Sequence, residues 1–262
     1  MSHFSVKNIR AGYGRHNVIE DISFELDGGT LMGVLGANGS GKTTLLKALC
    51  GILPHQGFCT LDGTVLEELP AKQLAQLVSY IPQRSGISID ISALDVVLMG
   101  FNPRLGLLEH PTKTMRAAAI QALAQVGLAD KEETNYLHLS EGQKQLCILA
   151  RTLVSDSSLL LLDEPESALD FRFRHQMLSL LRTWIDAQDR SALVTLHDPT
   201  LALNFCDRLL LLSGGGVLGI LEPKTDPLDK MEQMLCQVYG GISLQRCHNR
   251  NGETQIVMLR ED

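Results

Sequence analysis

The sequence predicts an α/β fold with a mostly parallel core sheet, and two observations lead to this prediction. Short apolar runs such as Leu31–Leu35 and Leu159–Leu162 alternate along the chain with segments of helical period. This alternation is typical of parallel strands joined by helical crossovers. The first apolar run also passes directly into a glycine-rich turn that is followed by a helical segment.

The N-terminal part of the chain is expected to form strands. Phe4–Ile9 begins one strand, and apolar residues alternate with polar ones over Ile22–Leu26, as in a strand with one buried face. We expect these strands to make an antiparallel β region ahead of the core. Thr43–Cys50 then predicts a helix, because its leucines share one face and Gly51 follows as a stop.

The middle of the chain predicts a helical insert over about 91–154. Apolar residues recur at helical spacing over Thr112–Val126, and Gly127 follows them. A second helix is expected from about Glu141 to Val154.

The α/β pattern returns at Leu159–Leu162, Ala192–Leu196 and Leu209–Leu212. A helix over about Leu228–Tyr239 and two strands around a turn signal at 251–252 are expected to end the chain. We expect one domain with three parts: a core of about 1–90 and 155–225, the helical insert of about 91–154, and a C-terminal helix and hairpin of about 226–262.

Composition excludes several classes of protein. The 262 residues are 44% hydrophobic and 20% charged, which is an ordinary globular mixture and not that of a disordered chain. The formal net charge is −7, so we expect no general attraction to nucleic acid. No apolar run is long enough to span a membrane, and no export signal opens the sequence. The cysteines and most histidines, His55 among them, show no metal-ligand spacing, so reduced and mostly buried thiols are expected.

The strongest motif is Gly36–Thr43, which reads GANGSGKT and satisfies the pattern G-x-x-x-x-G-K-[ST] of a phosphate-binding loop. Its glycines let successive backbone N–H groups converge on phosphate oxygens, and the following helix points its positive end at the same anion. Lys42 is suited to the β- and γ-phosphates, and the Thr43 hydroxyl is suited to Mg²⁺. The residues predicted to contact ATP here are Asn38, Gly39, Ser40, Gly41, Lys42, Thr43 and Thr44.

Two carboxylates follow the apolar run Leu159–Leu162, at the end of a strand where open α/β sheets place their ligands. Asp163 is suited to hold Mg²⁺, directly or through water. Strand alternation places Glu164 on the opposite side, where it could polarise a water for attack on the γ-phosphate. Without the phosphate-binding loop, both residues would be interpreted as solvated acids after a core strand.

Two further residues are interpreted together with the phosphate-binding loop and the two carboxylates. His197 follows the strand-like run Ala192–Leu196, and Gln83 follows another strand-like run over 78–82. Alone, a histidine at a strand end is usually structural and a glutamine in a loop is usually solvated. Next to the two motifs above, we predict that His197 contacts the γ-phosphate and that Gln83 belongs to the site.

Leu139–Gln143 reads LSEGQ, and together with the phosphate-binding loop it resembles the LSGGQ signature of ABC transporter nucleotide-binding subunits. A local interpretation stands beside this one. Ser140 is a good helix N-cap, and Gln143 three positions later completes a capping box. The resemblance covers nearly the whole chain, and its motifs follow one another in the family order.

The resemblance implies a role for each matching residue. In the family, the start of the signature helix contacts the γ-phosphate of ATP on the other subunit, which assigns Ser140, Gly142 and Gln143 to that contact in trans. The remaining correspondences are Tyr13 to the aromatic that stacks on adenine, Gln83 to the glutamine near Mg²⁺ and the membrane partner, Asp163 to the Mg²⁺ aspartate, Glu164 to the catalytic glutamate, Asp170 within 167–170 to the loop that communicates across the dimer, and His197 to the switch histidine.

One residue departs from the family pattern. Glu141 stands where the signature has its first glycine. An acid in the first turn suits the helix dipole, but it would repel a γ-phosphate if its side chain faced that group. The departure leaves nucleotide binding as predicted and bears on the rate of hydrolysis.

Two segments resemble the ATPases of importers for iron–siderophores, haem and vitamin B12. These are 95–103, which matches V-x-x-G-R-x-P except for Phe101 in place of arginine, and 234–241, which contains V-Y-G. The resemblance implies an ATPase that powers metal-chelate import. It also implies a head-to-tail pair of copies, separate permease subunits at the cytoplasmic face of the cell membrane and, indirectly, a substrate-binding protein. A soluble ABC ATPase of cofactor assembly or repair is the alternative.

Overall fold

The computed structural model describes residues 2–167, 169–187 and 190–261. Its core sheet has the strand order β10-β9-β3-β8-β7-β6, in which all neighbours are parallel except β10 and β9. This confirms the predicted mostly parallel core. The core strands are β3 (Leu31–Gly36), β6 (Val78–Ile81), β7 (Leu159–Asp163), β8 (Ser191–Thr195), β9 (Arg208–Ser213) and β10 (Gly216–Leu221).

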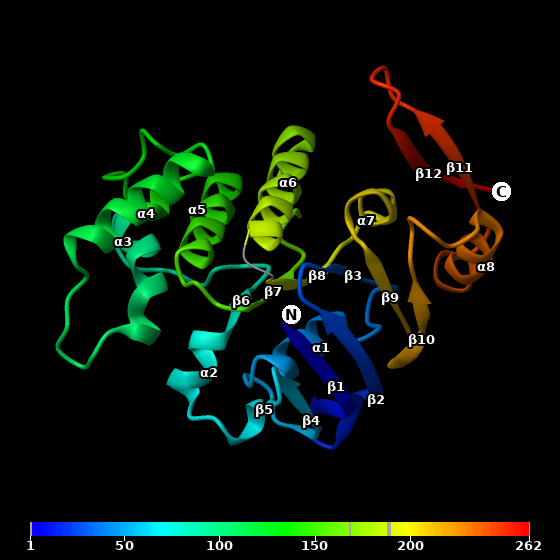
Figure 1. Cartoon of the computed structure of the whole chain (residues 1–262), viewed down its shortest axis with the longest axis horizontal. Helices are drawn as coiled ribbons and strands as arrows, with labels where there is room; N and C mark the ends of the chain where they lie inside the picture. Colours follow the sequence, from blue (N-terminus) through cyan, green and yellow to red (C-terminus); the bar gives the residue numbers. More distant parts are fainter. Residues whose placement is uncertain (1, 168, 188–189, 262) are drawn as a thin grey trace.

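The expected antiparallel region is also present, as a sheet of order β2-β1-β4-β5. Helix α1 packs between this sheet and the core sheet, so its leucines share one apolar cluster with residues of both sheets (Figure 1). The elements concerned are β1 (His3–Tyr13), β2 (His16–Asp27), α1 (Lys42–Leu49), β4 (His55–Leu61) and β5 (Thr64–Val65).

Strand β3 explains why the apolar runs are continuous and not alternating. Its side chains enter two different cores: Met32 and Val34 pack with α1, whereas Leu31 and Leu35 pack on the opposite face. A strand buried on both faces needs an apolar residue at every position. Each such leucine or valine contributes about 1.5–3 kcal/mol when fully buried.

The middle of the chain forms a separate helical lobe, seen on the left of Figure 1. Both predicted helices, over 112–126 and 141–154, begin and end within one residue of expectation. Thr112 is the N-cap of the first helix, and Gly127 follows its end with a φ of 83°. The elements of this lobe are α3 (Ala93–Leu98), the short 3₁₀ helix η2 (Met99–Arg104), α4 (Lys113–Gln125), the 3₁₀ turn η3 (Tyr136–His138) and α5 (Glu141–Leu153). Helix α2 (Ala71–Leu77) comes before the core strand β6, and its leucines pack with the cluster around α1.

The C-terminal helix and hairpin are present as predicted, but the turn is longer than two residues. The loop spans 249–253 and is closed by a hydrogen bond from Asn249 N to Glu253 O of 3.0 Å. Asn204 holds the hairpin, since its side chain donates to Ile256 O at 2.8 Å and accepts from Ile256 N at 2.9 Å. The remaining elements are α6 (Phe171–Ala187), α7 (Pro199–Phe205), α8 (Leu228–Tyr239), β11 (Ile242–His248) and β12 (Thr254–Arg260).

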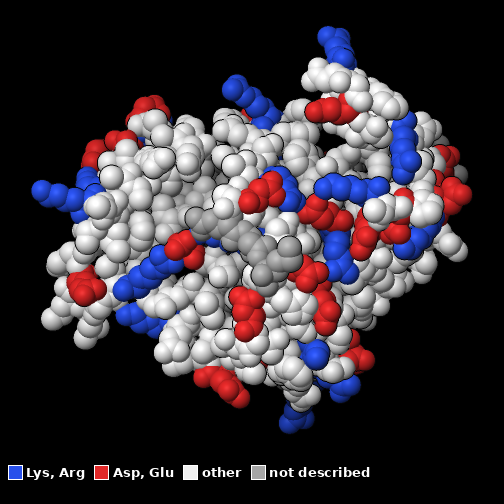
Figure 2. All heavy atoms as spheres, viewed as in Figure 1, with Lys and Arg blue, Asp and Glu red and all other residues white. Residues whose placement is uncertain are grey.

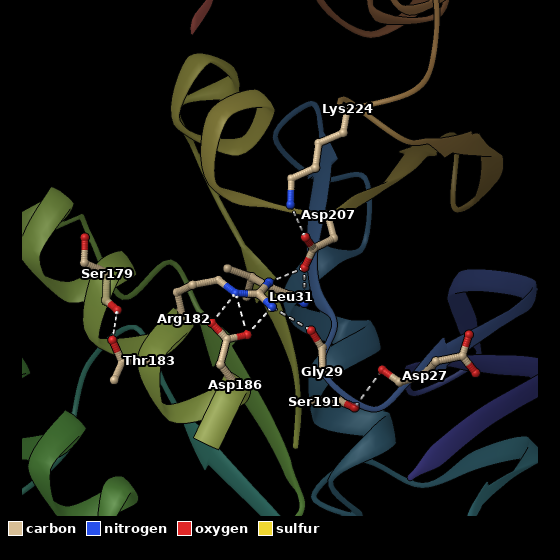
Figure 3. A network of polar contacts seen from close by, with 10 residues as sticks. All are labelled: Asp27, Gly29, Leu31, Ser179, Arg182, Thr183, Asp186, Ser191, Asp207 and Lys224. Atoms are coloured by element: carbon tan, nitrogen blue, oxygen red, sulfur yellow. Dashed lines mark hydrogen bonds and ion pairs between the residues drawn. The ribbon is translucent and has the colours of Figure 1, made fainter. Parts of the chain in front are cut away.

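A polar network joins α6 to the ends of the core strands (Figure 3). The Arg182 guanidinium forms ion pairs with Asp186 on its own helix and with Asp207 before β9. Asp207 also accepts from Leu31 N at 3.0 Å and pairs with Lys224 Nζ at 2.7 Å. One arginine therefore fixes the start of β3, and with it the strand that leads into the phosphate-binding loop.

The surface matches the weak negative charge of the sequence. Lys and Arg are interspersed with Asp and Glu over the face shown in Figure 2. Among the described helices, none combines the length and apolarity needed to cross a bilayer.

Candidate nucleotide-binding site

The loop Gly36–Thr43 joins β3 to α1, in the order predicted. Gly39 and Gly41 have φ values of 80° and 98°, a conformation that L side chains rarely adopt. A Cβ atom on Gly41 would lie 2.3 Å from Ile19 Cγ2, and one on Gly36 would lie 2.4 Å from Ser40 Oγ. The backbone conformation therefore favours glycine at Gly39, close packing requires it at Gly36, and both apply at Gly41.

Polar groups converge inside this loop. The Lys42 side chain is buried, and its Nζ donates to Gly36 O at 2.8 Å and Ala37 O at 3.3 Å. Ser40 Oγ is buried and has no hydrogen-bond partner within the described part of the chain. A buried hydroxyl without a partner costs free energy, so the loop presents both a cation and an unsatisfied hydroxyl to a ligand.

Asp163 ends β7 and is the centre of a hydrogen-bonded cluster. Its Oδ1 accepts from Thr43 Oγ1 at 3.0 Å and from Thr195 Oγ1 at 3.0 Å, and its Oδ2 accepts from Tyr80 OH at 3.3 Å. Burial raises the pKa of the Tyr80 hydroxyl, and the negative charge of Asp163 adds to this rise. Only 2% of Asp163 is exposed, so neighbouring strands fix its carboxylate in one place.

Glu164 is positioned by a turn of the backbone, so the premise of strand alternation does not apply to its side chain. Strand β7 ends at Asp163, and Glu164 has a φ of 44°, in the left-handed region. Its backbone N–H donates to Thr195 Oγ1 at 2.8 Å, and its Oε2 accepts from Gln83 Nε2 at 2.9 Å. The structure therefore brings Gln83 into direct contact with Glu164, while Thr195 joins Glu164 to Asp163.

His197 lies two residues after β8, and its side chain is exposed. Its backbone N–H donates to Glu166 Oε1 at 2.8 Å. Glu166 is 1% exposed, and its other oxygen, Oε2, is buried without a hydrogen-bond partner among the described residues. Burial raises the pKa of Glu166, although the hydrogen bond from His197 opposes this rise.

Sequence reasoning did not identify Tyr80, Thr195 or Glu166, which support Asp163, Glu164 and His197. Thr195 had a detectable signal: it is a hydroxyl residue at the end of an apolar strand, and in the sheet it pairs in register with Asp163. Glu166 follows the two predicted carboxylates closely in the sequence, but its contact with His197 depends on the fold. Tyr80 lies in the strand before Gln83 and had no distinguishing signal.

The pKa of Glu166 leads to a pH-dependent prediction for the variant Glu166→Gln, which keeps an acceptor for His197 N. A carboxyl with a raised folded-state pKa stabilises the native state at low pH, and this contribution is lost as pH rises from its unfolded pKa through its folded pKa. The unfolding free energy of the wild type minus that of the variant should therefore fall over this pH range. Urea unfolding of both proteins at several pH values measures this difference. A difference that does not change with pH contradicts the raised pKa.

Tyr13 ends β1 with a side chain that is 52% exposed. A tyrosine that served only to pack the core would be buried, so the structure removes that alternative. The exposed ring remains available for stacking on a base, as the resemblance implies.

The predicted capping box is confirmed at the start of α5. Ser140 Oγ accepts from Gln143 N at 3.3 Å, and Gln143 Oε1 accepts from Ser140 N at 3.0 Å. The Glu141 carboxylate instead pairs with Lys144 Nζ at 2.8 Å, and its side chain is 77% exposed. The ion pair with Lys144 partly neutralises the negative charge of Glu141, which stands where the family signature has a glycine.

The start of α5 lines a groove together with the residues at the start of α6. Ser140, Gly142 and Gln143 line a groove of about 400 Å³ with Asp170. Asp170 caps α6 by accepting from Phe173 N at 3.0 Å. No hydrogen bond or ion pair among the residues described joins this groove to Gly36–Thr43. Within 167–170, Ala168 lies outside the described residues.

The segment 95–103 covers the last four residues of α3 and all of η2 except Arg104. Phe101, which stands in place of the family arginine, is buried in the apolar core. Arg104 instead pairs with Asp156 Oδ2 at 2.8 Å, before β7. A Cβ on Gly100 would lie 2.2 Å from Arg151 O, so this glycine lets η2 pack closely against α5.

Comparison with known proteins agrees with these observations. The family model described as "ABC transporter" matches residues 19–167. The chain is 36% identical over 256 residues to the hemin import ATP-binding protein HmuV of Pseudomonas fluorescens, covering 95% of this chain and 97% of that protein. It is 37% identical over 262 residues to HmuV of Pseudomonas aeruginosa, covering 96% and 98%.

Two solved structures are similar over most of the chain. A chain of a metal-chelate type ABC transporter in an inward-facing conformation aligns with a TM-score of 0.83 and 28% identity, covering 100% of this chain and 99% of that chain. A dimeric ATP-binding cassette bound to ADP and Pi aligns with a TM-score of 0.75 and 22% identity, covering 84% and 98%, and shows the fold alone.

Proposed function

This chain belongs to the ABC transporter family as an ATPase, and from this premise we propose that it powers import of a metal chelate through separate membrane subunits. Haem, an iron–siderophore or a cobalamin is the class of cargo. The observation that carries the proposal is the convergence of the phosphate-binding loop with Asp163, Glu164 and Gln83 at the carboxyl ends of the core strands. Relatives that match almost the whole chain are named for hemin import, which favours transport over the soluble alternative.

The loop Gly36–Thr43 binds the phosphates of ATP in this proposal. Backbone N–H groups of the loop and of the start of α1 surround the phosphates, and Lys42 exchanges its bonds to Gly36 O and Ala37 O for phosphate oxygens. The phosphates also give Ser40 Oγ the partner that it lacks. Tyr13 stacks on the adenine.

The residues present fit a Mg²⁺ ion. Thr43 Oγ1 and Asp163 Oδ1 already lie 3.0 Å apart, and hydroxyl and carboxylate oxygens are the hard donors that Mg²⁺ prefers. Gln83 adds an amide oxygen. Bound there, Mg²⁺ supplies charge neutralisation between the β- and γ-phosphates.

Glu164 is the general base of the reaction. Its carboxylate orients a water and takes up a proton as the water oxygen attacks the γ-phosphorus; the bond from that phosphorus to the β-γ bridging oxygen breaks, and ADP and phosphate leave. Gln83 holds Glu164 at 2.9 Å, and Glu166 fixes the backbone from which His197 reaches the γ-phosphate.

A second copy of the chain completes the site. Ser140 and Gly142 lie at the start of α5, and none of their described hydrogen bonds reaches the phosphate-binding loop of the same chain. A head-to-tail pair would place each α5 start on the γ-phosphate held by the other copy. Asp170 lines the same groove and therefore lies at the contact between the copies.

The helical lobe carries the docking surface for the permease. Leu107 and Leu108 are 100% and 89% exposed, and Ile89 is 56% exposed, on the segments that follow Gln83 and η2. Apolar area gathered at a surface marks a protein interaction site, and the adjacent Leu107 and Leu108 supply such area in the helical lobe. The chain would thereby sit at the cytoplasmic face of the membrane through the permease, which receives cargo from a substrate-binding protein, with no role for nucleic acid.

A crosslinking experiment tests whether this surface meets a membrane protein. A photo-reactive amino acid at Leu107 should crosslink to an integral membrane protein in native membranes, whereas one at Ile52, which is 60% exposed at the end of α1, should not. Mass spectrometry of the adduct then identifies the permease. If position 107 forms no such adduct and the protein is recovered only with soluble assembly or repair factors, the transport proposal is wrong.

A further inference from the structure

Three side chains with different metal-binding atoms meet at the edge of the antiparallel sheet, outside the nucleotide site. His55 begins β4, Cys59 lies within β4, and Glu67 lies in the short 3₁₀ helix η1 (Leu66–Glu68). Their ligand atoms, one nitrogen, one sulfur and one oxygen, all lie within 4.8 Å of one another. The sequence spacing gave no hint of this, because the cluster depends on a bend in β4.

The bend is located at Gly57. In a regular strand, residues four apart are separated by about 13 Å, too far to share an ion easily. Gly57 has a φ of 89°, and the pairing between β1 and β4 shifts register between Lys7 and Arg10. A Cβ on Gly57 would lie 2.5 Å from both Lys7 O and Asn8 O, so only glycine fits this bend. The irregularity brings the side chains of His55 and Cys59 toward Glu67.

The three side chains are held in place by further contacts. His55 Nε2 lies 3.0 Å from Glu67 Oε1, and His55 Nδ1 lies 3.4 Å from Leu53 O. Glu67 Oε1 also accepts from Cys59 N at 2.8 Å. A histidine that binds metal through one nitrogen usually bonds a carbonyl or carboxylate through the other. The Leu53 carbonyl is placed to play this part.

The degree of burial also fits a metal site with one open side. The side chain of His55 is 8% exposed and that of Glu67 is 29% exposed, while Cys59 is 1% exposed. The thiol and the imidazole are therefore largely shielded from water, and the carboxylate faces the solvent from which an ion would enter.

We propose that His55 Nε2, Cys59 Sγ and a Glu67 carboxylate oxygen bind one divalent transition-metal ion of the Zn²⁺ class. Thiolate and imidazole donors select against Mg²⁺ and Ca²⁺, whereas a nitrogen, sulfur and oxygen set suits Zn²⁺. Zn²⁺ bonds of about 2.0–2.3 Å place ligand atoms roughly 3.3–3.8 Å from one another. His55 Nε2 already lies 3.0 Å from Glu67 Oε1, and all three ligand atoms lie within 4.8 Å of one another. As the sulfur–metal bond forms, the Cys59 thiol releases its proton to solvent, and water takes the fourth position.

The site is adjacent to the strand that carries Tyr13. His55 pairs with Ala11 in the sheet, two residues before Tyr13. A bound ion would fix the edge of the sheet from η1 through β4 to β1. The proposal concerns metal binding alone and does not depend on transport or on ATP hydrolysis.

Cobalt titration of the metal-stripped, nucleotide-free protein tests this site, because a Co²⁺–thiolate bond gives a charge-transfer absorption that oxygen-only sites lack. We expect one equivalent of Co²⁺ to produce the band and Zn²⁺ to remove it by displacement. Cys59→Ser should abolish the band. His55→Gln should weaken cobalt binding by at least about 10–100-fold, the loss seen when even a supporting partner of a ligand is removed.

Cys247→Ser is the matched control, since Cys247 is the exposed thiol and has a histidine beside it. The band should persist in this variant. Glu67→Gln is a second test variant in case Cys59→Ser does not fold, because its amide oxygen can still accept from Cys59 N. It should weaken cobalt binding as His55→Gln does. Absence of a thiolate band in the wild type, or a band that survives Cys59→Ser or that Cys247→Ser removes, overturns the proposal.

Discussion

Replacing Glu164 with Gln is expected to slow ATP hydrolysis by about 10²–10⁴-fold, the usual contribution of a positioned general base. The variant keeps an oxygen that can accept from Gln83 Nε2, so the geometry of the site should be retained. What it loses is the ability to take a proton from the attacking water. Binding of ATP should be nearly unchanged, because Glu164 does not hold the nucleotide in the ground state.

Phosphate release by the intact transporter complex measures this effect. Glu133→Gln is a suitable control, since Glu133 is an exposed acid that pairs with Arg116 in the helical lobe. The control should turn over at the wild-type rate. Near-normal turnover of Glu164→Gln in the complex would rule out Glu164 as the base.

Replacing Lys42 with Ala should weaken ATP binding strongly. Hydrogen bonds to a charged group contribute about 1.5–3 kcal/mol each, so losing one or two phosphate contacts corresponds to a fall in affinity of at least about tenfold to a hundredfold. The substitution also leaves the carbonyl groups of Gly36 and Ala37 without their present donor.

Equilibrium titration with labelled ATP measures this loss. Lys47→Ala is the matched control, because Lys47 lies in the last turn of the same helix and away from the loop. Thermal melting of both variants shows whether each is folded. Unchanged affinity in folded Lys42→Ala contradicts the assignment of the phosphate-binding loop.

Local patterns were sufficient to predict much of the fold. Continuous apolar runs identified β3, β7, β8 and β9, because the middle of a strand buried on both faces is apolar at successive positions. Capping signals fixed the helix that begins after Ser140, since a capping box is complete within four residues. The phosphate-binding loop was likewise identified by its spacing, whereas Tyr13 and Asp170 were assigned through the family resemblance. The roles of all the motif residues in binding and catalysis stay predictions.

The supporting residues could not be predicted in the same way, because their contacts join distant parts of the chain. Thr195 contacts Asp163 only because β8 pairs with β7 in this register. Glu166 contacts His197 only because the segments that follow β7 and β8 leave the sheet at the same edge. The cluster of His55, Cys59 and Glu67 required a bend that no periodicity reports. Strand alternation could not place Glu164, because the strand ends one residue earlier, at Asp163.

The central claim is that ATP joins two copies of this chain, each completing the site of the other through the start of α5. Light scattering of Glu164→Gln with and without Mg-ATP tests it most directly, because the variant binds ATP and does not consume it. We expect a shift from monomer to dimer on adding Mg-ATP. We expect Ser140→Arg to abolish this shift, while titration shows that ATP still binds. A dimer that persists in the Ser140→Arg double variant, or one that forms equally well without nucleotide, would contradict it.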